Sequence, residues 1–172
     1  SFGSDVSNTN YLLTDRLYGD TTKSFNYLNL FPKVNFTYNL SKQTSLNFYY
    51  AGNTVQPSFT QIQPLRQNAN PLNVTIGNPN LQQGFDHKVT TRFNDYKVLS
   101  NRYFWGSVSF TYHERAISTE QTYINGVNTT RYINVDGNYS GWGYAGYGFK
   151  IKKLDLDIGL QLNGSLYHVN NR

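Results

Sequence analysis

Near the C-terminal end of the chain, apolar and polar residues alternate without interruption. Leu154, Leu156, Ile158, Leu160 and Leu162 are separated by Asp155, Asp157, Gly159, Gln161 and Asn163. A period of two identifies a β-strand, because successive side chains of a strand point to opposite faces. One face of this strand is purely aliphatic, so we expect it to contact an apolar medium while the other face contacts a polar one.

The same alternation recurs along most of the chain. Together the patterns predict about six long strands, near 31–40, 45–56, 85–96, 103–118, 131–149 and 154–169. The fifth predicted strand differs in composition, because Gly141, Gly143, Gly146 and Gly148 are interleaved with Tyr and Trp. Glycine weakens an ordinary strand, so we interpret this segment as bent or closely packed beside large rings.

The connectors between these strands alternate in length. Short links at 41–44, 97–102 and 150–153 alternate with long ones at 55–84 and 119–130. Short turns on one side and long loops on the other are typical of outer-membrane barrels, with the turns periplasmic and the loops extracellular. The pattern therefore predicts an all-β fold, an antiparallel transmembrane β-barrel in the outer membrane of a Gram-negative bacterium, with the lipid bilayer as its partner.

Strand number decides how much of such a barrel the chain could form. Six strands are too few to close around a lumen, since the smallest barrels use about eight. Either residues 1–29 supply extra strands, or the chain is an internal part of a larger barrel wall, which is the arrangement we expect. The opening residues 1–29, with Asn8-Thr9-Asn10 and Tyr18-Gly19-Asp20, are predicted as an extracellular loop or strand end.

Two other architectures remain open at this point. A soluble or surface-attached β-sandwich that binds glycans or proteins through its loops also collects Tyr and Phe in strands. Sandwich strands are usually about 5–6 residues long, however, and several predicted here reach ten or more. A small complete barrel with a passive or adhesive role is the second alternative.

Composition narrows the functional classes. The chain has no Cys, which excludes disulfides and thiolate metal sites. Its charge of +5 is scattered singly, so we expect no nucleic-acid partner. A mean hydropathy of −0.58 is compatible with a barrel, because barrel strands place only alternate residues in lipid. His87, His113 and His168 lie far apart in predicted strands, so we expect no metal, no cofactor and no enzymatic activity.

One long connector carries a more specific signal. Three elements follow a Tyr-rich strand: Gln56-Pro57-Ser58-Phe59-Thr60-Gln61-Ile62-Gln63-Pro64, Asn70-Pro71, and Gly77-Asn78-Pro79-Asn80-Leu81. This stretch of sequence resembles the barrel domain of TonB-dependent outer-membrane receptors, particularly those of the Bacteroidota. In that family a Pro-containing stretch rises into an external loop, and a Gly-Asn-Pro-x-Leu element leads into the next descending strand. The chain departs from the pattern after Leu81, where Gln82-Gln83-Gly84 replaces a Pro and an acidic residue.

The resemblance implies a function and a larger context. It implies a TonB-dependent transporter that takes up a scarce nutrient, with this chain an internal piece of a barrel of about 22 strands. The partners implied are the TonB complex, through a plug domain not present in this chain, and possibly a surface lipoprotein. The resemblance does not identify the transported ligand.

Strands and motif together give a division of the chain. Residues 1–172 form part of one barrel domain, with hairpins at 30–56, 85–118 and 131–172 and extracellular loops at 57–84 and 119–130. Four prolines stiffen the loop 57–84. Its candidate ligand-binding residues are Phe59, Arg66, Gln67, Asn68 and Asn78. The alternative is a simple connecting loop that folds over the barrel mouth.

Overall fold

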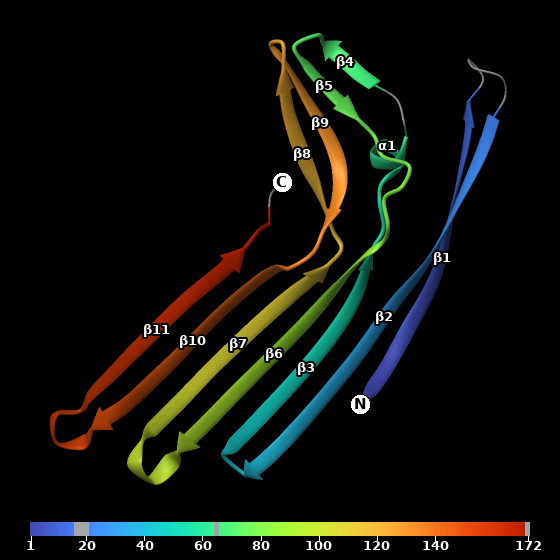
Figure 1. Cartoon of the computed structure of the whole chain (residues 1–172). Helices are drawn as coiled ribbons and strands as arrows, with labels where there is room; N and C mark the ends of the chain where they lie inside the picture. The colour runs from blue at the N-terminus through green and yellow to red at the C-terminus, as the bar shows by residue number, and fades with distance from the viewer. Residues whose placement is uncertain (16–20, 64–65, 171–172) are drawn as a thin grey trace.

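A computed structural model describes residues 1–15, 21–63 and 66–170, and its main feature is a seven-stranded antiparallel sheet (Figure 1). The strands lie in the order β1-β2-β3-β6-β7-β10-β11. Their bounds are β1 Phe2–Asp15, β2 Thr21–Ser41, β3 Thr44–Val55, β6 Gly84–Lys97, β7 Arg102–Glu114, β10 Asn138–Ile151 and β11 Leu156–His168. The predicted long antiparallel strands are thus confirmed.

The strand register places the apolar residues on one face of this sheet. Val108 of β7 lies opposite Thr91 of β6 and Gly143 of β10, and the same face continues through every strand. Its large side chains are strongly exposed, as shown by Phe36 (57%), Val108 (62%) and Leu162 (79%). No second layer covers this face among the described residues, so the arrangement is not that of a β-sandwich, whose core lies between two sheets.

The opposite face is polar. It carries Asn35 on β2, Asn47 on β3, Arg92 on β6, Ser107 on β7 and Asn163 on β11. An apolar face and a polar face on one long sheet are what a barrel wall requires, with lipid outside and water inside. We call these the lipid face and the lumen face.

The short connectors all lie at one end of the sheet, as predicted. The chain turns at 42–43 between β2 and β3, and through 3-10 turns at Val98–Ser100 and Lys152–Leu154. Both 3-10 turns end in a left-handed residue, Asn101 (φ 46°) and Asp155 (φ 48°). Asn and Asp tolerate this conformation better than other non-glycine residues, which explains their position at the turns.

The opening segment corrects one prediction. Residues 1–29 were expected as an extracellular loop or strand end, but Phe2–Asp15 form β1 and pair with β2 over their full length. The alternation was hidden because this strand has polar residues on both faces, such as Asn8 and Asn10 beside Val6 and Leu12. The sheet therefore has seven strands instead of six.

The long connectors also contain regular structure. A second sheet, in the order β4-β5-β9-β8, forms at the end opposite the short turns (Figure 1). Its strands are β4 Arg66–Asn70, β5 Asn73–Ile76, β8 Ala116–Ile124 and β9 Val127–Val135, and β5 pairs with β9 in parallel. A short helix, α1 Phe59–Ile62, precedes β4. The two connectors thus fold together outside the wall.

Two predicted strand ends shift as a result. The strand expected at 103–118 ends at Glu114, since Arg115 has a left-handed backbone (φ 50°) and β8 follows. The strand expected at 131–149 is interrupted at Asp136-Gly137, where Gly137 has φ 86°. The first break redirects the chain from the wall into the outer sheet, and the second redirects it from the outer sheet back into the wall. The alternation of side chains on either side concealed both breaks. Among the described residues, no helix is long and apolar enough to cross a membrane.

Candidate functional site

The connector that carries the specific motif folds as a compact loop unit, residues 57–63 and 66–84, at the external end of the wall. Its interior consists of Pro57, Ile62 and Val74, whose side chains are less than 2% exposed. Helix α1 starts where the Ser58 backbone N–H donates to the Gln61 side-chain oxygen at 2.8 Å. The loop 57–84 therefore has a small core of its own.

The two ends of the motif pack against each other. The Asn78 backbone N–H donates to the Gln61 carbonyl at 2.7 Å, and the Asn78 side-chain Nδ2 donates to the Tyr132 carbonyl at 2.9 Å. A Cβ atom at Gly77 would lie 1.9 Å from the carbonyl oxygen of Gln63. Only glycine allows this close approach of two backbones.

Replacement of Gly77 by alanine should therefore open the loop unit. Because the obstructing atom is backbone, the loop must move, and overpacking of this kind costs about 1–3 kcal/mol. Limited proteolysis of the full-length protein should show faster cleavage within 57–84 for Gly77→Ala. Gly164→Ala is the control, since a Cβ there meets no neighbour within 4 Å and, as at Gly77, the backbone has no positive φ. Equal cleavage rates in Gly77→Ala and wild type would contradict the packing.

The five predicted ligand-binding residues occupy different parts of this unit. Phe59 lies on α1 and is 39% exposed, with its ring edge-on to Tyr11 at 6.5 Å between centroids. Arg66, Gln67 and Asn68 lie on β4, which the structure describes through its backbone pairing with β5. Asn78 uses its amide nitrogen for Tyr132 and its side-chain oxygen for the Asn80 backbone N–H, so its groups hold the fold. A ligand role for these residues stays a prediction.

A buried amide network connects the loop unit to the wall. Asn29 of β2 is 5% exposed and its Nδ2 donates to the side chains of Ser7, Thr9 and Gln56 at 3.4, 3.2 and 3.0 Å. Its Oδ1 accepts from Gln83 Nε2 at 3.0 Å. One side chain thus joins the β1–β2 hairpin to both ends of the loop.

Replacement of Asn29 by leucine should loosen this junction. Each buried polar group left without a partner costs about 1–3 kcal/mol, so we expect a local loss of that order. Hydrogen exchange should become faster in residues 2–13 and 24–30 while the exchange of β7 and β10 is unchanged. A control is Asn26→Leu, a substitution at an exposed position on the same strand. Unchanged exchange in Asn29→Leu would show that the network contributes nothing.

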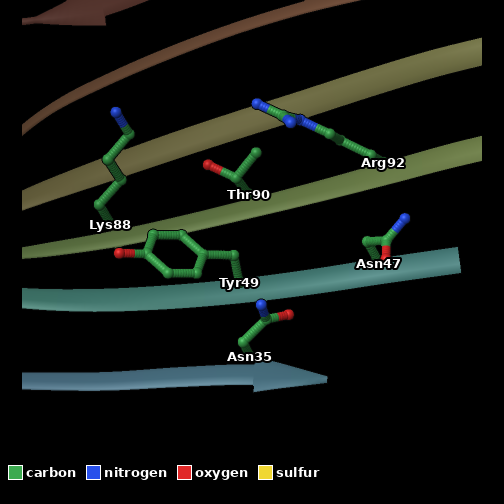
Figure 2. Close-up of a pocket in the computed structure, with 6 residues that line it drawn as sticks. All are labelled: Asn35, Asn47, Tyr49, Lys88, Thr90 and Arg92. Carbon is green, nitrogen blue, oxygen red and sulfur yellow. The ribbon is translucent and has the colours of Figure 1, made fainter. Parts of the chain in front are cut away.

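A hollow of about 440 Å³ lies on the lumen face and was not predicted from sequence. Figure 2 shows its lining, with Asn35 on β2, Asn47 and Tyr49 on β3, and Lys88, Thr90 and Arg92 on β6. We call it the lumen pocket. The side chains come together because Asn35 pairs with Tyr49, Tyr49 with Thr90, and Asn47 with Arg92 across the strands.

The electrostatics of the lumen pocket favour an anion. Within the described residues, neither Lys88 nor Arg92 has a carboxylate within 4.0 Å, whereas Lys33 on the same face pairs with Asp5 at 3.2 Å. The remaining lining consists of amides and hydroxyls, which can both donate and accept hydrogen bonds. The pocket can therefore bind a polar solute that carries negative charge.

No group of three or more His, Asp or Glu side chains within residues 1–15, 21–63 and 66–170 is arranged to hold a metal ion.

Alternation alone could have assigned Lys88 and Arg92 to the polar face. It could not have shown which residues of β2 and β3 lie beside them, because the register between strands is not visible in one sequence.

The fold and its two faces define the class of protein: a membrane-embedded β-barrel wall with external loops. A model of the outer membrane protein beta-barrel family matches residues 6–172, and the chain belongs to that family. Its location is accordingly the outer membrane of a Gram-negative bacterium. Neither the curated proteins nor the solved structures contain a match to this chain.

Proposed function

We propose that the chain is part of a TonB-dependent outer-membrane transporter that takes up a scarce nutrient. The external loop unit supports this proposal most directly. Of the residues that resemble those of TonB-dependent receptors, 56–63 and 77–81 form a single packed element through Gly77, Asn78 and Gln61. The packing of these residues against each other supports the interpretation of the motif as one element at the barrel mouth.

The open edges of the sheet also support a larger barrel. In the part of the chain that the structure describes, β1 pairs only with β2 and β11 pairs only with β10. A bilayer does not tolerate unpaired backbone groups, so we propose that further strands continue the wall at both edges. A wide barrel of this kind accommodates a plug and a solute path, as transport requires.

The outer sheet offers a contact surface for a partner. Leu72, Tyr123 and Ile124 are 59%, 75% and 63% exposed at its outer end, where the Asn128 backbone N–H donates to the Leu72 carbonyl. Exposed apolar side chains grouped at a loop tip are a common feature of protein contact sites. We propose this tip as the place where a surface lipoprotein would contact the barrel. The proposal assigns no catalysis to the chain.

A binding measurement tests the transporter proposal without knowledge of the nutrient. The full-length protein that contains this chain, purified in detergent, would be titrated with the isolated periplasmic domain of TonB in a calorimeter. We expect saturable binding that is lost when the N-terminal segment preceding the plug is removed. No binding at any protein concentration tested would contradict transport and favour a small barrel with a passive or adhesive role.

A further inference from the structure

Four aromatic side chains form a ladder on the lumen face of β7 and β10. They are Tyr103 and Trp105 on β7, followed by Tyr144 and Trp142 on β10. Each ring lies opposite a small residue of the neighbouring strand, namely Gly148, Gly146, Ser107 and Ser109 in the same order. We call these four rings the aromatic ladder.

The small residues let the rings lie along the wall instead of projecting from it. A Cβ at Gly146 would be 2.2 Å from the Trp105 ring, and a Cβ at Gly148 would be 2.1 Å from the Tyr103 ring. Ser107 and Ser109 are only 3% and 2% exposed. The glycines that interrupt the pattern of β10 on this face are therefore explained by the rings that cover them.

The rings form two stacked pairs and remain accessible. Tyr103 and Trp105 have centroids 5.3 Å apart with 25° between planes, and Trp142 and Tyr144 have values of 5.9 Å and 13°. Trp142 is 47% exposed although it lies on the water-facing side. We call a row the set of residues that lie opposite one another across the strands. Neighbouring rows on one face of the sheet are about 7 Å apart, so the four rows that hold the rings extend for about 20 Å along the strands.

On the neighbouring strands β6 and β3, two of these rows contain polar residues that line the lumen pocket. The row of Trp142 runs through Ser109 and Thr90 to Tyr49, and the Thr90 and Ser109 hydroxyls lie 3.0 Å apart. The row of Tyr144 runs through Ser107 to Arg92 and Asn47. Arg92 therefore lies two strands from Tyr144, about 10 Å away, and on the strand next to Trp105.

We propose that the ladder and the lumen pocket together bind an acidic oligosaccharide. The faces of sugar rings carry C–H bonds that pack on the electron-rich faces of aromatic rings. Sugar hydroxyls suit the amides and hydroxyls of the pocket, and the carboxylates of uronic acids suit Lys88 and Arg92. A single-stranded nucleic acid fits less well, since it needs cations that follow each phosphate along the whole track.

This inference rests on the proposed function, because it names the substrate class of the transporter. Its test uses the full-length protein in detergent and follows tryptophan fluorescence during titration with an oligogalacturonate hexasaccharide. A neutral glucose hexasaccharide and a single-stranded oligonucleotide serve as comparison probes. We expect saturable binding of the acidic sugar and weaker binding of the neutral one.

One variant on β6 and two variants on opposite faces of β10 locate the binding surface. Trp142→Ala should weaken binding of both sugars about tenfold, because one stacking contact is lost. Arg92→Gln should weaken only the acidic sugar. Tyr147→Ala is the matched control, because Tyr147 is an aromatic residue of β10 on the lipid face, and it should change neither. Heat-modifiable gel mobility, which differs between folded and unfolded barrels, checks that each variant is folded.

Three results would overturn the inference. They are no binding of the acidic sugar, binding that folded Trp142→Ala and Trp105→Ala proteins retain in full, or tighter binding of the oligonucleotide. Binding of the TonB domain without sugar binding would leave the transporter proposal standing and remove this one. Sugar binding without TonB binding would remove transport and keep the lumen surface as a carbohydrate site.

Discussion

Leu162→Lys should lower the stability of the folded barrel in a bilayer by about 2–4 kcal/mol, the cost of a charge at mid-membrane on the lipid face. Leu162 is the middle residue of β11 and is 79% exposed on the apolar face. Ile158 is on the same face but pairs with Phe149 close to the turn. Leu162 is therefore the better position for a charge at mid-membrane. The measurement is the free energy of unfolding by guanidinium chloride in lipid vesicles.

The adjacent residue supplies the matched control for this substitution. Asn163 is also exposed on β11 but points to the lumen face. Asn163→Lys introduces the same charge one residue away, and we expect a change within about 0.5 kcal/mol. Similar losses of stability in the two variants would mean that the two faces of β11 contact the same medium.

Ile62→Ala should produce the second large effect, in the external loop unit. The Ile62 side chain is 0% exposed, and truncation of a buried Ile costs about 2–5 kcal/mol. Because the cavity lies in the loop, the loss should appear in local opening of residues 57–84 and not in unfolding of the wall. Hydrogen exchange of the full-length protein, read by mass spectrometry, separates the two.

Phe59 provides the comparison for Ile62 on the same helix. Its side chain is 39% exposed, so Phe59→Ala removes less buried surface and should accelerate exchange in the loop much less than Ile62→Ala. If both variants exchanged at the wild-type rate, the loop unit would not have the cooperative core described above.

Alternation of side chains was sufficient to predict the wall. Residues 156–163 and 33–40 could be assigned to strands with one lipid face because each keeps period-two order through the membrane. Leu154 and Asp155, which were expected in the last strand, lie in the turn instead. The rule failed for β1 and for the breaks at Arg115 and Asp136-Gly137. In β1 polar residues occupy both faces, and at the two breaks the alternation continues on either side, so the pattern marks neither that strand nor those strand ends.

The site was predicted less well than the fold. The loop 57–84 was located by its prolines and its family resemblance, but its interior contact between Gly77 and Gln63 depends on a turn of the backbone. The lumen pocket and the aromatic ladder depend on which residues of different strands lie opposite each other. Trp105 and Gly146 lie opposite each other but are 41 residues apart in the sequence, and periodicity within one strand does not predict such a pairing.

The most direct test of the central claim is a nitroxide scan along β7. Single Cys substitutions from 104 to 112 are informative because the chain itself has no Cys. In bilayers, labels at Phe104, Val108, Phe110 and Tyr112 should collide mainly with oxygen dissolved in lipid. Labels at Ser107, Ser109 and Thr111 should collide mainly with a water-soluble nickel chelate. The same collision rates at odd and even positions would contradict a wall with lipid on one face and water on the other.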